Sequence, residues 1–166
     1  MNTHPLFIDN VAFAKRDDRI AGTLTLADCK RLAEVLQSAE IRYVLQGENN
    51  LGRFTLRLQL DAELQVTCQR CLSSMPLNLH REFNYLINDA PLSEYEFSDL
   101  EENDDIDLVE PSPAMDLISL IEDELLMAMP IAPAHDEDCS ASLKDGVAQS
   151  GEKPNPFAVL KGLIKP

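Results

Sequence analysis

Residues 53–60 read RFTLRLQL, a strict alternation in which every second side chain is apolar. The apolar side chains would share one face of a β-strand, with Arg53, Thr55 and Arg57 on the opposite face. A strand with one apolar and one polar face is half-buried, as in a sheet covered on one side. This stretch therefore predicts a strand at the centre of the fold.

The neighbouring segments extend the same period of two. Residues 41–45 alternate, residues 47–52 supply a turn, and the two segments flanking that turn predict a hairpin with a long polar loop. Residues 64–67 predict a short strand, residues 77–85 another, and Asp107-Leu108 a brief one. Consecutive strands joined by short turns favour an antiparallel β-meander over a βαβ arrangement.

Two segments have a helical period instead. Thr25 and Asp28 resemble a capping box before apolar residues spaced as in an amphipathic helix, which predicts a helix over 26–38 with Cys29 buried on its inner face. Residues 115–129 predict a core helix that ends near Pro130. The predicted class is α+β: an antiparallel meander packed by an N-terminal helix and a core helix in the C-terminal half, with a long acidic loop.

A length of 166 residues fits a single domain, residues 1–166. Acidic side chains crowd residues 91–113, which predicts a solvated, mobile loop whose alternative role is docking a basic partner. Residues 140–154 predict a polar linker, and Asn155 followed by Pro156 predicts the start of a short helix over 155–166.

The net charge of −15 argues against a protein that coats nucleic acid with its whole surface and favours a basic partner. The N-terminus lacks the features of a signal peptide, and no apolar run is long enough to cross a bilayer. We therefore expect a cytoplasmic protein without a membrane partner. In that compartment its four cysteines stay reduced, which favours metal binding or redox chemistry over disulfides.

Two spaced pairs of ligand residues predict a metal site. Cys68 and Cys71 form a Cys-x-x-Cys pair between two predicted strands, and His135 with Cys139 forms a second pair. Thiolate and imidazole ligands in such pairs are typical of zinc. The alternative is that both knuckle cysteines are small apolar residues at a strand end and that His135 is a surface histidine.

The same Cys-x-x-Cys pair admits a thiol-disulfide oxidoreductase as a third hypothesis. Such a motif usually starts a helix within a βαβ unit, whereas here a strand follows the pair, so redox chemistry is disfavoured. The sequence contains no phosphate-binding glycine loop and no nucleophile elbow. We expect no catalytic residues, no enzyme activity and no small-molecule substrate.

The order of motifs resembles one known family. The motifs are CQRC at 68–71, EDELLMAMP at 122–130, PAHD at 133–136 and KPNPFAVL at 153–160. This chain is similar to the YceD family, the large ribosomal RNA subunit accumulation proteins. The resemblance implies a non-enzymatic factor for the synthesis, processing or stability of 23S ribosomal RNA in large-subunit biogenesis. The 153–160 block is its most distinctive part, and we expect its residues to bind a partner: Asn155, Pro156, Phe157 and Leu160.

Two kinds of partner remain open. Direct contact with large-subunit ribosomal RNA would use a few local cations, for which the candidates are Arg53, Arg57, Arg70 and Arg81. A solvated outer face is the plainer interpretation of the two strand arginines. The alternative function is an acidic holding or adapter protein for a basic ribosomal protein.

Overall fold

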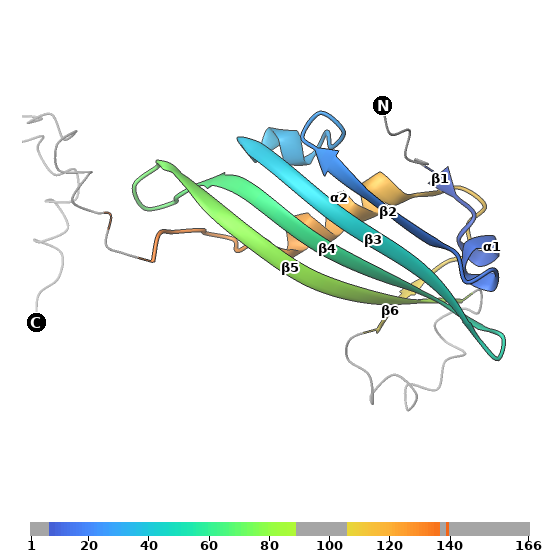
Figure 1. Ribbon diagram of the computed structural model, residues 1–166. Helices are drawn as coiled ribbons and strands as arrows, with labels where there is room; N and C mark the ends of the chain where they lie inside the picture. The colour runs from blue at the N-terminus through green and yellow to red at the C-terminus, as the bar shows by residue number, and fades with distance from the viewer. Residues whose placement is uncertain (1–6, 89–105, 137–138, 140–166) are drawn as a thin grey trace, which may run out of the picture.

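The computed structural model describes residues 7–88, 106–136 and 139. The described chain is mostly β-structure, with a five-stranded sheet covered on one face by a helix (Figure 1). The elements in chain order are β1 (Phe7–Ile8), α1 (Asn10–Lys15), β2 (Arg19–Thr25), the 3-10 helix η1 (Leu32–Glu34), β3 (Ser38–Asn50), β4 (Arg53–Thr67), β5 (Ser74–Ile87), β6 (Ile106–Val109), β7 (Met115–Asp116) and α2 (Leu117–Ala128).

The sheet has the strand order β2-β3-β4-β5-β6. Neighbouring strands are antiparallel from β2 to β5, which confirms the predicted meander. The predicted short strand at 107–108 is confirmed as β6, but it pairs parallel to β5, so the sheet is mixed. A parallel pair requires a long crossover connection. Residues 89–105, which make this connection and hold most of the predicted acidic loop, lie outside the described residues, as do 140–154 and 155–166.

The β3–β4 hairpin is longer and tighter than predicted. Its strands pair continuously from Ser38 opposite Gln65 to Asn50 opposite Arg53, so the predicted long loop at 47–52 and the separate strand at 64–67 are both wrong. Gly47 does not lie in a turn; it allows helix α1 to approach strand β3 closely. A β-carbon on Gly47 would lie only 2.7 Å from the Ala14 Cα of helix α1. The loop is reduced to two residues.

Those two residues have a left-handed backbone. Leu51 has φ of 53° and Gly52 has φ of 90°, the combination that a type I′ hairpin turn requires. Leucine is strained there, whereas asparagine tolerates the conformation. Because Leu51 is fully exposed, we expect Leu51→Asn to raise the free energy of unfolding by about 1 kcal/mol in urea titration. The β-branched variant Leu51→Ile should lower it, and the reverse ranking would contradict the assigned turn.

Gly47 gives a prediction of the opposite sign. Its added β-carbon would also lie 2.8 Å from the Phe13 carbonyl oxygen, and both clashing atoms belong to the backbone. Overpacking of this kind costs about 1–3 kcal/mol. Gly47→Ala should therefore lower the midpoint of urea unfolding. The control is Gly52→Ala, which introduces backbone strain but no clash, since nothing lies within 4 Å of its β-carbon position. Equal stability of Gly47→Ala and wild type would contradict the packing of α1 on β3.

The core lies between the inner face of the sheet and α2. On α2, Leu117, Ile121 and Leu125 are no more than 1% exposed. They belong to one apolar cluster with the inward side chains of β3, β4 and β5. The side chains in that cluster from these strands include Ile41, Tyr43, Leu45, Leu56, Leu58, Leu60, Leu64, Leu79 and Tyr85. The opposite sheet face carries the polar half of each alternation.

The predicted core helix is confirmed as α2. Its N-cap is Asp116, whose carboxylate accepts hydrogen bonds from the backbone N–H groups of Ile118 and Ser119 at 3.0 and 3.2 Å. Two acidic side chains of the helix are buried: Glu122 and Glu124 are only 4% and 5% exposed. The Tyr85 hydroxyl donates to Glu124 Oε1 at 2.6 Å. These buried carboxylates were not predicted.

Burial of Glu124 has a pH-dependent consequence. Burial raises the pKa of Glu124, the Tyr85 hydrogen bond opposes that rise, and the nearby carboxylates of Asp107 and Asp123 add to it. A carboxyl whose folded pKa is raised contributes stability at low pH and loses it as pH rises through the folded pKa. Glu124→Gln, which keeps an acceptor for Tyr85, should therefore unfold at higher temperature than wild type at pH 7. Melting curves from pH 7 down to about 4 should show this advantage shrinking; an advantage that grows on acidification would contradict the sign.

The prediction of a helix over 26–38 is wrong. The N-terminal α-helix of the structure is α1, which lies earlier in the chain. Asp28 does accept a hydrogen bond from the Thr25 N–H at 2.9 Å, as a capping box would, but only η1 forms. The N–H groups of Arg31 and Leu32 donate to Glu122 Oε1 at 2.7 and 3.1 Å. A carboxylate from α2 thus takes donors that helix formation would have used.

Cys29 is buried within this segment, as predicted. Burial, with the nearby Glu122 and Asp28 carboxylates, raises the pKa of its thiol to about 12. The thiol therefore stays protonated and acts as a small apolar side chain.

Candidate metal centre

The loop between β4 and β5 holds the first pair of cysteines in a tight knuckle. The Cys68 N–H donates to the Ser73 carbonyl and the Leu72 N–H donates to the Cys68 carbonyl, each at 2.9 Å. Leu72 has φ of 62°, which turns the chain back into β5. The Arg70 N–H points at Cys68 Sγ at 3.4 Å. Backbone geometry alone therefore brings both thiols to one side of the loop.

The second pair comes from residues 130–136 and Cys139, called the strap below. In Figure 1 the strap runs from the end of α2 towards the β4–β5 loop. The Gln69 N–H donates to the Pro133 carbonyl at 2.8 Å, and the Arg70 guanidinium donates to the His135 carbonyl. Protein–protein hydrogen bonds thus seat the strap against the knuckle.

The four predicted metal ligands converge at this junction. The donor atoms of Cys68, Cys71, His135 and Cys139 all lie within 4.8 Å of one another. Cys68 Sγ is 3.8 Å from Cys139 Sγ, and Cys71 Sγ is 3.5 Å from His135 Nδ1.

Two of these separations match what a tetrahedral zinc ion would require. With Zn–S of about 2.3 Å and Zn–N of about 2.0–2.1 Å, tetrahedral angles imply about 3.8 Å between two sulfurs and about 3.6 Å between sulfur and nitrogen. The two distances in the structure are 3.8 and 3.5 Å. The cluster could therefore hold a metal ion, and its three sulfurs and one nitrogen form a donor set that zinc favours.

The knuckle favours the thiolate form that binds metals. Burial opposes ionisation of Cys68, but hydrogen bonds from three backbone N–H groups, chiefly that of Cys71, prevail and lower its pKa to about 5. The Ser73 hydroxyl lowers the pKa of the Cys71 thiol. Burial and the neighbouring cysteines raise the pKa of Cys139 to about 11. A third thiolate thus needs a cation beside it, which a divalent metal would provide.

The structure does not bring the four candidate RNA-binding arginines together. Arg53 and Arg57 lie on the outer face of β4, where Arg57 is 3.6 Å from Glu48 and 3.8 Å from Glu82. Arg81 pairs across the strands with Leu60, which is buried on the inner face, so it is placed on the opposite side of the sheet from Arg57.

The remaining arginine lies at the far end of the sheet. Strand β4 has fifteen residues between the hairpin and the knuckle. At about 3.3 Å per residue, roughly 45 Å separates Arg53 from Arg70. A single phosphate-binding strip cannot include both ends. The candidate partner-binding residues Asn155, Pro156, Phe157 and Leu160 lie outside the described residues.

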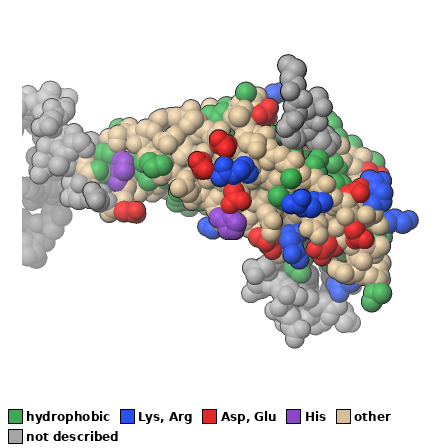
Figure 2. Space-filling model, viewed as in Figure 1, with side chains coloured by type: hydrophobic (Ala, Val, Ile, Leu, Met, Phe, Trp, Pro, Cys, Tyr) green, Lys and Arg blue, Asp and Glu red, His purple; other side chains and the backbone are tan. Residues whose placement is uncertain are grey.

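Mixed charge covers the outer face of the sheet instead. Arg42 bridges Glu40 and Glu63 at 3.0 and 2.9 Å, and His80 Nδ1 is 2.5 Å from Asp61. Figure 2 shows acidic and basic side chains interleaved over this part of the molecule. Paired arginines have less charge available for phosphate, which weakens the case for this face as an RNA-binding surface.

Comparison with known proteins identifies the family. The family model for "Large ribosomal RNA subunit accumulation protein YceD" matches residues 56–164, a range that includes all four candidate ligands. A Haemophilus influenzae protein of the same description is 31% identical over 175 residues, covering 96% of this chain and 95% of the relative. This chain belongs to the YceD family. No solved structure matches it significantly.

The match confirms the resemblance to the YceD family that the order of motifs indicated. The family takes its description from accumulation of large-subunit ribosomal RNA, and that description names no reaction. None of the helices in the described ranges combines the length and apolar character that crossing a membrane requires. The described part of this YceD-family chain combines a five-stranded sheet, the helix α2 and a Cys₃His cluster that could hold a metal ion.

Proposed function

We propose that this YceD-family chain is a non-enzymatic cytoplasmic factor in the synthesis, processing or stability of 23S ribosomal RNA during large-subunit biogenesis. The observation that carries the proposal is the similarity, over nearly the full length of both chains, to a relative described as a large ribosomal RNA subunit accumulation protein. The converging side chains form a candidate metal clasp between two parts of the fold, a structural role that requires no catalytic step.

Zinc is the ion that we propose for Cys68, Cys71, His135 and Cys139. The Cys68–Cys139 and Cys71–His135 donor separations fit its tetrahedral coordination. Zinc would supply positive charge to the thiolates and a cross-link between the knuckle and the strap. The role is structural: the strap follows α2 directly, so fixing it to the β4–β5 loop holds the end of the helix on the sheet.

The charge distribution favours a basic protein over RNA as the direct partner. The net charge is −15, and Arg42 and Arg57 on the outer sheet face already have acidic neighbours. A basic large-subunit ribosomal protein would be attracted by such a surface, whereas phosphate would be repelled. We infer that the factor holds or delivers such a protein and supports the RNA through it.

Matched variants separate the two partners. Replacing Arg53 and Arg57 by Ala should leave RNA association of the factor unchanged if a protein partner mediates it, whereas direct contact predicts a weaker, less salt-dependent association. Neutralising the acidic side chains of 94–105 to their amides should reduce co-purification of a basic ribosomal protein. Substitution is preferable to deleting residues 94–110, because that deletion would also remove strand β6, which pairs with β5 from Ile106 onward.

The oxidoreductase alternative rests on the low pKa of Cys68. Against it, a third thiol and an imidazole converge on the same pair, and the knuckle joins two strands instead of opening a helix. Purified protein should show no turnover of a disulfide substrate, while a Cys68-dependent rate would support that alternative.

Sedimentation of a cell extract tests where the factor acts. We expect the protein, or a crosslinked complex with one basic ribosomal protein, to co-migrate with precursors of the large subunit. Exclusive migration at the position of the free protein, with no crosslinked ribosomal component, would contradict a role in subunit assembly.

A further inference from the structure

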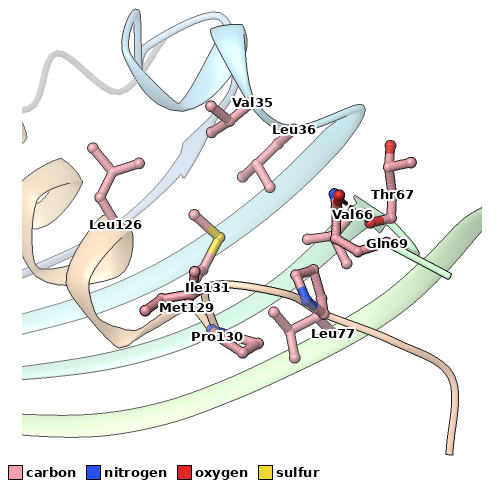
Figure 3. A pocket seen from close by; sticks show the side chains of 11 residues that line it. Val35, Leu36, Val66, Thr67, Gln69, Leu77, Leu126, Met129, Pro130 and Ile131 are labelled. Carbon is pink, nitrogen blue, oxygen red and sulfur yellow. Dashed lines mark hydrogen bonds between the residues drawn. The ribbon is translucent and has the colours of Figure 1, made fainter. Parts of the chain in front are cut away.

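An apolar groove lies beside the knuckle, where α2, the η1 segment, the end of β4 and the strap meet. Its volume is about 260 Å³. Figure 3 shows Leu126 and Met129 from the α2 end, Val35 from the η1 segment and Ile131 from the strap around the same hollow. A cavity of about 150 Å³ accommodates a benzene ring. The groove therefore has room for an aromatic and an aliphatic side chain.

The rim of this groove leaves large apolar side chains in water. Ile131 is fully exposed and Val35 is 55% exposed. Covering such side chains is favourable in proportion to the apolar surface removed from water. An apolar segment is the matching occupant.

The C-terminal sequence supplies such a segment within the same chain. Phe157, Leu160 and Ile164 follow one another at the spacing i, i+3, i+7 that helices use to fill apolar grooves. Residues 153–166 contain three lysines and no acidic residue, so the rest of the chain carries a net charge of −18. Charge therefore draws this segment towards its own acidic body.

The attachment point of the segment favours occupancy from within the chain. Cys139 lies 3.8 Å from Cys68, sulfur to sulfur, and Gln69 and Pro133 both line the groove. Residues 140–154 separate this anchor from Asn155. For a polar linker of that length, chain statistics give an average span of about 20 Å and an effective concentration in the millimolar range. Even a weak site is filled under such conditions.

We propose that residues 155–164 dock into this groove of the same molecule, with Phe157 as the aromatic anchor. Docking would shield Ile131 and Val35 and withdraw the tail from other partners until a competing ligand displaces it. The proposal does not require a bound metal, because the hydrogen bond from Gln69 to Pro133 seats the strap independently. It also stands apart from the ribosomal role, since it concerns the isolated protein.

The lack of tryptophan allows a direct test. Phe157→Trp places a unique fluorophore at the anchor, and Val147→Trp places one in the preceding segment as a reference. Acrylamide should quench the Phe157→Trp protein at least about twofold less than the Val147→Trp protein, because effective concentration keeps the tail docked. Its emission should also lie to the blue of the reference.

Groove variants complete the test. Ile131→Asp or Val35→Asp, combined with Phe157→Trp, should restore strong quenching. These two side chains lie on different walls and are exposed, so neither change threatens the fold. Leu51→Asp, fully exposed at the distant hairpin, is the matched control and should change nothing.

Three outcomes would overturn the proposal. They are equal quenching at positions 157 and 147, protection that persists in both groove variants, and protection that disappears on dilution as dimers dissociate. The last would show a second copy as the occupant. If the first outcome gives way to protection after ribosomal RNA or ribosomal protein is added, the tail belongs to that partner.

Discussion

Purified Cys68→Ser protein is expected to contain no stoichiometric metal and to melt about 10 °C below wild type, since losing a ligand bound at a thousand times its Kd costs about 4 kcal/mol. The wild-type protein should contain one equivalent of zinc. The fall in Tm follows from the clasp, because the strap then keeps only its hydrogen bonds, including Gln69 to Pro133. Elemental analysis paired with calorimetry measures both quantities.

Cys29 is the matched control for this experiment. It is also buried, but it lies outside the group of four donors. Cys29→Ala should lose some stability through the cavity it creates and keep its zinc in full. A chelator should lower the Tm of wild-type and Cys29→Ala proteins, with no effect on Cys68→Ser. The zinc proposal would be contradicted if purified wild-type protein contains no metal and a chelator does not change its Tm.

Glu122→Ala is expected to lower the free energy of unfolding by about 2–4 kcal/mol, because a backbone donor left without an acceptor costs about 1–3 kcal/mol and Glu122 serves two of them. The carboxylate accepts from the N–H groups of Arg31 and Leu32, and its second oxygen lies 3.5 Å from the Arg31 guanidinium. Without it, the two backbone donors lose their acceptor near the core. Urea titration measures the loss.

The neighbouring Asp123 makes a sharp control. Its carboxylate is 2.5 Å from the same Arg31 guanidinium, but its side chain is 56% exposed. A surface ion pair contributes about 0–1 kcal/mol, so Asp123→Ala should be nearly neutral. Glu122→Gln, which keeps one acceptor oxygen, should fall between the two. Equal losses for Glu122→Ala and Asp123→Ala would contradict a backbone-binding role for Glu122.

The sequence predicted those parts of the fold whose causes are local. Alternation over 53–60 and its neighbours located β3, β4 and β5, since a period of two follows directly from strand geometry. The apolar positions of 115–129 located α2. The spacing of Cys68, Cys71, His135 and Cys139 named the donors that the fold brings together. The two residues of such a ligand pair are close in sequence, so a tight turn is enough to bring them together and their spacing can be recognised in the sequence.

Features that depend on distant residues could not be predicted in this way. Within the helix expected over 26–38, Glu122, some ninety residues away, takes two backbone donors, and only the 3-10 helix η1 forms. Strand β2 was missed because most of its residues are small or polar, and Leu24 is the one that is buried. Arg81 was grouped with Arg57, although strand register places them on opposite faces. Each of these outcomes is set by tertiary partners.

The most direct test of the central claim is the ratio of mature 23S to 16S ribosomal RNA in cells that lack this protein, with and without a plasmid copy of its gene. We predict a ratio below that of wild-type cells, restored by the wild-type copy and by Cys29→Ala, and restored poorly by Cys68→Ser. An unchanged ratio in cells lacking the protein would contradict a role in accumulation of large-subunit ribosomal RNA.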